Sequence, residues 1–223
     1  MLVFVHVPKT AGTSFVQTLL DLGLGDAIRD YNDCPIHRNR VMVKVNALLF
    51  AKKFKPVPEA EILYGHFLAR KYHSLKGRRL VTWLRNPVQR LVSHYDYWQR
   101  EYDPATACPL HRRMIEECWD FQRFALGAEL RNLQSYFLWG VPLKDFDFVG
   151  VTENYSQDLR KFGVRFNAHI KSSCQLNIRP DSPNPLSTAM RKRIEQWHAK
   201  DMRLYSQAIQ LGRSGYWGES LNA

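Results

Sequence analysis

The stretch His6-Val7-Pro8-Lys9-Thr10-Ala11-Gly12-Thr13-Ser14 decides the fold, because it joins the apolar run Leu2–Val5 to a segment with helical periodicity. A strand, a turn of small residues and a helix start together favour anion binding. The unpaired N–H groups of a helix's first turn point outward, and the peptide dipoles add partial positive charge. Lys9 adds a full charge beside them. The stretch therefore predicts a site for phosphate or sulfate.

The turn resembles a P-loop, but its spacing differs. Its lysine precedes a single glycine, whereas the pattern G-x-x-x-x-G-K-[ST] places the lysine directly after the second glycine. This order argues against an ordinary ATPase. A tight strand-to-helix turn capped by Thr or Ser is the alternative interpretation of the turn taken alone.

A second apolar run, Leu80–Leu84, also leads into a helical pattern. Asn86 can cap that helix, and Pro87 fits its first turn. The helix has apolar residues at three- and four-residue steps, so one of its faces should pack on the sheet. Arg85 is then expected at the carboxyl end of the strand.

The two motifs should meet, because open parallel sheets bind ligands at the carboxyl ends of their strands. Lys9 suits a compact oxyanion as a point charge. Arg85 offers a planar fork for bidentate phosphate contact, and Ser93 offers a hydroxyl donor. The pair of motifs predicts a ligand with two separated phosphate groups.

Both motifs resemble those of sulfotransferases that use 3'-phosphoadenosine 5'-phosphosulfate (PAPS), especially the carbohydrate group that includes the heparan sulfate 2-O- and 6-O-sulfotransferases. The stretch Leu84–Ser93 resembles their 3'-phosphate motif, with Asn86 where many members have Asp. The resemblance implies that Arg85 and Ser93 bind the 3'-phosphate. It also implies a 5'-phosphosulfate loop made of Pro8, Lys9, Thr10, Ala11, Gly12, Thr13 and Ser14.

Shorter matches extend the resemblance in the same order along the chain: Tyr64–Phe67, Asn132–Ser135 and Phe148–Glu153. The resemblance implies that His66 is the general base, although Tyr64 replaces the first histidine of the family's His-Gly-His pattern. Without the resemblance, a surface or hydrogen-bonded core histidine would be the ordinary interpretation of His66.

The proposed chemistry needs one base and several cations. A histidine with an ordinary pKa of about 6.5 can accept the proton of an acceptor hydroxyl at neutral pH. Lys9 would stabilise charge on the bridging oxygen and the sulfuryl group, as cations do in phosphoryl transfer. This chemistry requires no metal, and we predict none.

The composition fits one catalytic domain over residues 1–223, since 45% of the residues are hydrophobic. The sequence shows no apolar run of about 18 residues and no secretory signal pattern. We therefore expect a cytoplasmic protein without stable membrane insertion. A Golgi-lumenal catalytic domain separated from its anchor is the alternative.

The formal net charge of +11 indicates an anionic partner, which the nucleotide already supplies in part. An anionic glycan is the expected hydroxyl acceptor, and basic clusters such as Lys76–Arg79, His111–Arg113 and Arg191–Arg193 could line its groove. Solvated helix faces are the ordinary interpretation of any one cluster. The loop Tyr102–Arg113, which would shape the acceptor pocket, has no recognisable motif. The sequence therefore does not identify the acceptor, and it does not indicate the oligomeric state.

Two other functions compete with sulfuryl transfer. A P-loop-like kinase using ATP should show the order Gly-Lys-Ser/Thr and a carboxylate for magnesium, and the sequence offers neither. A nucleic-acid-binding module would explain the charge but not the two anion motifs. We therefore predict no nucleic-acid partner.

The expected fold is α/β: a P-loop-like three-layer arrangement with a central parallel sheet flanked by helices. Strands are expected at 2–7, 61–64, 79–84 and 146–151, and helices at 12–22, 112–126 and 130–137. The segment 26–58 is ambiguous, because Val41–Val45 alternates like a strand while Asn46–Phe54 could be helical. After a polar loop at 171–185, Ser187 should cap one long helix. The buried stripe of that helix is expected to be Met190, Ile194, Trp197, Leu204 or Tyr205, and Ile209.

Two further expectations concern single segments. The family resemblance places Lys171–Ser173 at the border of the nucleotide site. The cysteines show no metal-ligand spacing. Cys108 and Cys118 could close a short loop in an oxidising compartment, but free thiols are the expectation for a cytosolic chain.

Overall fold

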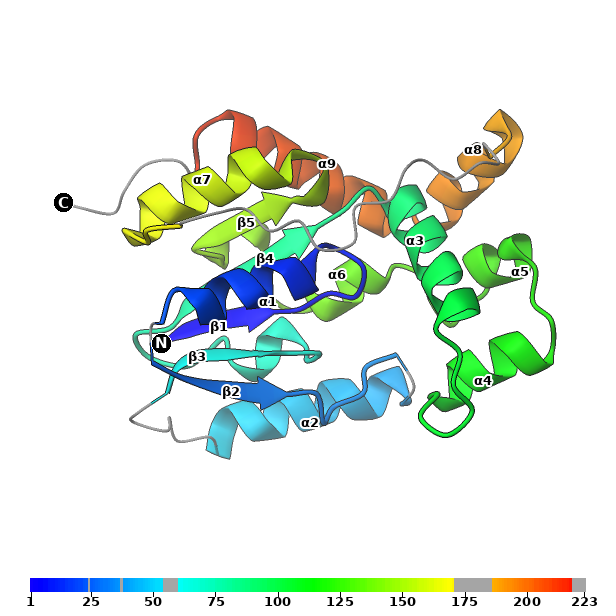
Figure 1. The fold of residues 1–223 in the computed structure, drawn as a ribbon, viewed down its shortest axis with the longest axis horizontal. Coiled ribbons are helices and arrows are strands. Elements are labelled where there is room, and N and C mark those ends of the chain that lie inside the picture. Colours follow the sequence, from blue (N-terminus) through cyan, green and yellow to red (C-terminus); the bar gives the residue numbers. More distant parts are fainter. Residues whose placement is uncertain (24, 37, 54–59, 171–185, 218–223) are drawn as a thin grey trace.

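A computed structural model describes residues 1–23, 25–36, 38–53, 60–170 and 186–217. Within these residues, five parallel strands form one sheet in the order β2-β3-β1-β4-β5 (Figure 1). The strands are β1 (Leu2–Val5), β2 (Asp26–Asp30), β3 (Ala60–Gly65), β4 (Arg79–Leu84) and β5 (Phe148–Val151). The helices are α1 (Gly12–Asp21), α2 (Arg40–Lys53), α3 (Pro87–Arg100), α4 (Pro109–Glu116), α5 (Phe121–Leu126), α6 (Leu133–Phe137), α7 (Tyr155–Phe166), α8 (Thr188–Trp197) and α9 (Ala199–Arg213).

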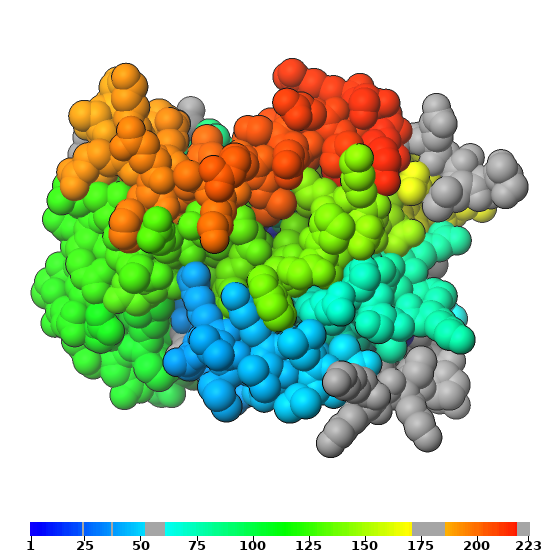
Figure 2. Space-filling view, turned by 180° about the vertical axis from the view of Figure 1, so that it is seen from behind, coloured from blue at the N-terminus to red at the C-terminus, as the bar shows by residue number. Residues whose placement is uncertain are grey.

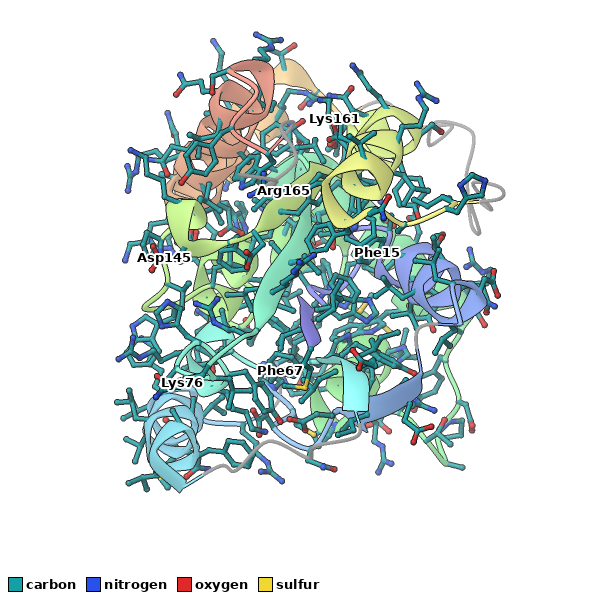
Figure 3. The ribbon with its side chains drawn as sticks, turned by 90° about the vertical axis from the view of Figure 1, so that its left-hand side faces the viewer. Phe15, Phe67, Lys76, Asp145, Lys161 and Arg165 are labelled. Carbon is teal, nitrogen blue, oxygen red and sulfur yellow. The ribbon has the colours of Figure 1, made fainter. Side chains whose placement is uncertain are left out.

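Helices cover both faces of the sheet. α1 and α7 lie on one face (Figure 1), and α2, α6 and α9 lie on the other, which faces the viewer in Figure 2. Phe15 points from α1 into the layer below it (Figure 3), where its ring lies 4.8 Å from Phe4 and 5.0 Å from Phe162 on α7. The prediction of a three-layer α/β fold with a parallel central sheet is confirmed.

The strand order creates a crevice between the ends of β1 and β4. After β1 the chain crosses to β2 at one edge of the sheet, whereas after β4 it continues to β5 at the other edge. Ligands of open parallel sheets bind where neighbouring connections diverge in this way. In Figure 1, α3, α4, α5 and α8 gather beyond this carboxyl edge. Both anion motifs begin here, directly after Val5 and Leu84.

The described residues of the ambiguous segment 26–58 form one strand, β2, and one helix, α2. β2 is a mostly exposed edge strand that the sequence analysis missed. Val41–Val45 is helical, because it begins α2. Val43 and Ala47 are buried on the inner face of α2, while Val41, Met42 and Val45 are exposed. With apolar residues on both faces, the helical period does not stand out, and the strand-like alternation was accidental.

The stretch 112–126 is largely helical as predicted, but the chain divides it between two short helices, α4 and α5. Cys118 has φ 49° between them, and the Trp119 N–H donates to the carbonyl of Met114 at 2.9 Å. Asp120 then caps α5 by accepting from the Arg123 N–H at 2.7 Å. Cys108 and Cys118 are free thiols in the structure, and Cys174 lies outside the described residues.

The long C-terminal helix is also divided, between α8 and α9. Ser187 caps α8 as predicted, by accepting from the Met190 N–H at 3.2 Å. The break occurs at His198, whose fully buried ring accepts from the Asn132 N–H and bonds to the carbonyl of Ala125. Two tertiary bonds to one side chain fix the chain here. Most of the predicted stripe faces inward: Ile194 is buried, and Met190, Leu204, Tyr205 and Ile209 are partly buried against the core. Trp197 is half-buried, and its Nε1–H donates to the Gly127 carbonyl at 3.4 Å.

Candidate functional site

The loop after β1 is held by its own residues. Lys9 and Ala11 have positive φ angles of 69° and 64°, which L-residues rarely adopt. The fully buried Thr10 hydroxyl donates to the carbonyl of Val7 at 2.9 Å. The Thr10 side chain therefore holds the turn, and any contribution of Thr10 to ligand binding would come from its backbone. Thr13 is exposed at the start of α1, and Ser14 is buried.

The Lys9 ammonium lies over an aromatic ring and among other cations. Its Nζ is 3.7 Å from the centroid of Tyr97 on α3. Burial, followed by the charges of Arg85 and Arg100, lowers the Lys9 pKa to about 8, while Glu101 opposes this shift. Cations that are crowded together and partly desolvated are stabilised when an anion binds between them.

Arg85 lies directly across the crevice from this loop. Its Nη1 donates to the carbonyl oxygen of Lys9 at 3.4 Å, so the two anion motifs are in contact. Burial lowers the Arg85 pKa, and Glu153 partly offsets this. Its buried Nε has no hydrogen-bond partner among the described residues. An unpaired buried donor on a cation is costly unless a ligand satisfies it, and an anion would do so.

The backbone of Arg85 is held by the fully buried side chain of Gln134. The Arg85 N–H donates to Oε1 of Gln134 at 2.9 Å, and Nε2 of Gln134 donates back to the Arg85 carbonyl at 2.8 Å. The N–H of Gln134 itself donates to the buried carboxylate of Asp201 on α9 at 3.1 Å. Arg85 is thus fixed by residues distant in the sequence.

The start of α3 confirms the predicted cap. Asn86 accepts from the N–H groups of Val88 and Gln89 at 3.0 and 3.3 Å, and Pro87 is the first helical residue. The Asn86 N–H donates to Oε1 of Glu153, which follows β5, at 2.8 Å. Ser93 lies about two turns further along α3 and is half-buried.

His66 directly follows β3 at the same edge of the sheet. Its half-buried ring lies 4.7 Å from His6, 4.6 Å from Tyr31 and 6.1 Å from Phe137, measured between ring centroids. His6 Nδ1 is 2.9 Å from the Tyr31 hydroxyl. Burial, together with the charges of His66 and Lys9, lowers the His6 pKa well below its usual value. His6 is therefore a neutral ring at neutral pH.

The structure brings the loop Pro8–Ser14, His66 and Arg85 to the carboxyl edge of the sheet, after β1, β3 and β4, and it joins Lys9 directly to Arg85. Ser93 lies further along α3. Lys171–Ser173 lies outside the described residues. Four residues with clear roles here were missed: His6 and Tyr97 beside the predicted residues, and Gln134 and Asp201 behind Arg85. Only Gln134 carried a signal, because it lies within the short match Asn132–Ser135. His6 begins the stretch His6–Ser14, but nothing in that pattern gives its ring a role, and Tyr97 and Asp201 lie in stretches without an informative spacing.

No protein-family model matches the chain, and no curated protein sequence matches it. Among solved structures, mouse sulfotransferase SULT7A1 complexed with PAP aligns with a TM-score of 0.50 at 12% identity, over 96% of this chain and 88% of its own. A sulfotransferase from Alicyclobacillus acidocaldarius aligns with a TM-score of 0.45 at 14% identity, over 92% and 94% of the two chains. The similarity to the mouse protein shows a shared fold.

Proposed function

We propose that this chain is a sulfotransferase that moves a sulfuryl group from PAPS to a hydroxyl acceptor. The observation that carries the proposal is the contact between the two anion motifs, Arg85 Nη1 to the Lys9 carbonyl at 3.4 Å. This contact puts two cation-bearing backbone turns at the crevice between β1 and β4. A nucleotide with phosphate groups at both its 3' and 5' positions fits such a pair of turns. The shared fold with a PAP-bound sulfotransferase agrees with it.

The residues present suit this donor. The buried Nε of Arg85, unpaired within the described residues, offers a charged donor to the 3'-phosphate, and the Ser93 hydroxyl offers a second. The loop Pro8–Ser14 would bind the 5'-phosphosulfate with backbone N–H groups at the start of α1. PAPS supplies an activated sulfuryl group.

Two side chains would act in the transfer itself. The Lys9 ammonium would stabilise the negative charge that develops on the bridging oxygen. A ring nitrogen of His66 would take the proton from the acceptor hydroxyl.

The described part of the chain has no helix long and apolar enough to cross a membrane. We propose one catalytic domain over residues 1–223 acting on a carbohydrate, because the resemblance to carbohydrate sulfotransferases and the charge of +11 both favour an anionic glycan.

The donor assignment is tested by thermal unfolding with nucleotides. PAP is 3'-phosphoadenosine 5'-phosphate, the product that remains when PAPS has given up its sulfuryl group. At about 100 times its Kd, PAP should stabilise the fold by about 2.7 kcal/mol. ATP with magnesium at the same concentration should stabilise it far less, because only PAP offers a 3'-phosphate to Arg85 and Ser93. Equal or greater protection by ATP would contradict the proposal and favour the kinase alternative.

The base is tested by His66→Ala, assayed with labelled PAPS against a panel of glycans, phenols and lipids. Turnover should fall by about 10²- to 10⁴-fold, the range for loss of a general base, while PAP affinity stays nearly unchanged. His73→Ala is the matched control, because His73 is a half-buried histidine outside the predicted site, paired with Asp145 at 3.1 Å. Wild-type turnover in His66→Ala would place the base elsewhere.

A further inference from the structure

Three rings form one cluster at the ends of β1, β2 and β3. His6, Tyr31 and His66 each follow one of these strands directly, and the strands are neighbours in the sheet. The His6 and Tyr31 rings are each within 5 Å of His66, at 4.7 and 4.6 Å between centroids. The distance of 2.9 Å between His6 Nδ1 and the Tyr31 hydroxyl links the other two members. The proposed base therefore has two polar aromatic neighbours that bond to each other.

His6 also contacts the anion loop. A Cβ atom at Gly12 would collide with Cδ2 and Nε2 of the His6 ring, so the first residue of α1 lies directly against the imidazole. On its other side the His6 ring stacks on Phe4, with centroids 5.5 Å apart. His6 is only 8% exposed. Its ring fills the space between the loop that would hold the donor and the ring that would act as base.

The charged groups around His6 favour a neutral ring. Lys9 and His66 both disfavour a second positive charge at this position, and burial acts in the same direction. The Tyr31 hydroxyl is neutral at physiological pH, because burial raises its pKa to about 12. His6 is therefore an uncharged neighbour of His66.

We propose that His6, anchored by the Tyr31 hydroxyl, is a positioning residue that holds the His66 ring in one orientation relative to the loop at Gly12. This inference rests on the proposed role of His66 as the base. It predicts that the nitrogen of His66 facing the acceptor is set by the packing of His6 and by the His6–Tyr31 hydrogen bond. It also explains why glycine is required at the start of α1, where any side chain would displace the imidazole.

The experiment is NMR of protein with ¹⁵N-labelled histidine, which reports the tautomer of each imidazole without an acceptor or donor. In the wild type, His66 should show one dominant tautomer. In His6→Ala the His66 signals should become those of a mixture, because the packing of the His6 ring against His66 is lost, whereas His6→Phe should restore most of the wild-type pattern. His111, bonded to the Trp98 carbonyl at 2.6 Å, is the internal control and should not change.

A second variant keeps the test decisive if His6→Ala fails to fold. Tyr31→Phe removes only the hydroxyl and should shift the His66 signals in the same direction by a smaller amount. In turnover assays, His6→Ala should lower kcat about tenfold or more while the PAP Kd stays within about twofold. Unchanged His66 signals in both variants would overturn the inference. Failure of the proposed function would appear separately, as a wild-type protein that neither binds PAP nor transfers sulfuryl.

Discussion

The two anion motifs occupy the same crevice but are held in place in opposite ways. The loop after β1 is stabilised by a neighbour: Thr10 bonds to Val7, three residues earlier. Arg85, after β4, is held by Gln134, which is 49 residues away, and Gln134 is held in turn by Asp201, a further 67 residues along. One motif is a local structure, whereas the other is assembled by the tertiary fold.

This difference predicts that the anion affinities of the two motifs respond differently to mutations elsewhere in the chain. A local turn forms wherever its few residues are present, so its anion affinity should tolerate distant changes. A guanidinium held by a buried network depends on each member, because a partner removed from the network leaves unpaired polar groups behind. The 3'-phosphate half of the site should therefore respond to mutations far outside the motif, and the 5' half should not.

The largest expected effect is that of Arg85→Ala on PAP binding. Hydrogen bonds to charged groups contribute about 1.5–3 kcal/mol, so PAP affinity should fall by about 10- to 100-fold. Affinity for adenosine 5'-phosphate, which lacks the 3'-phosphate, should change by less than about twofold. Calorimetric titration of both ligands measures the difference.

Arg203→Ala is the matched control for Arg85→Ala, because it removes the same charge from an exposed position on α9. It should leave both affinities unchanged at physiological salt, where distant exposed charges are screened. An equal loss of PAP and adenosine 5'-phosphate affinity in Arg85→Ala would show that the two halves of the site are not distinct.

A smaller effect is expected from Gln134→Ala, which removes both hydrogen bonds to the Arg85 backbone without altering a charge. The free energy of unfolding should fall by about 1–3 kcal/mol, the cost of leaving buried polar groups unpaired. PAP should bind more weakly, while adenosine 5'-phosphate should bind as before. Urea denaturation and the same titrations measure the two effects.

Thr10→Val is the local counterpart of Gln134→Ala, since it removes one buried hydroxyl of the loop at nearly constant volume. It should also lower stability, but its effect on binding should fall equally on PAP and adenosine 5'-phosphate, because both carry the 5'-phosphate. If Gln134→Ala weakened both ligands equally, the contrast between a local and a tertiary motif would be lost.

The same contrast explains what could be predicted from the sequence. The strand-turn-helix around Lys9 and the Asn86-Pro87 helix start were predicted because each depends on a few neighbouring residues. His6 was missed, because its role arises only when β1, β2 and β3 lie side by side. Nothing near Asp201 in the sequence indicates that its carboxylate supports a helix more than 60 residues earlier.

The errors in the helix predictions have the same physical origin. The break at His198 comes from bonds to Ala125 and Asn132, which a periodic pattern cannot reveal. α2 was ambiguous because its exposed face is as apolar as its buried face. In both segments tertiary contacts decided the outcome over local periodicity.

The smallest expected effect tests a long-range contact of the local loop, that of the Lys9 ammonium with the Tyr97 ring. Because the Lys9 pKa is lowered to about 8, its charge is present below that pH and is lost as the pH rises through it. In sulfuryl transfer, kcat/KM should therefore decline above pH 8. Tyr97→Leu keeps an apolar cover but removes the ring that favours the ammonium, so the decline should begin at a lower pH. A cation–π contact of about 0.5–1 kcal/mol corresponds to a shift of less than about one pH unit.

Tyr97→Phe keeps the ring and should follow the wild-type profile. A decline that moves to higher pH in Tyr97→Leu would mean that the ring acts on Lys9 chiefly by excluding water, and that the cation–π contact contributes little to its charge.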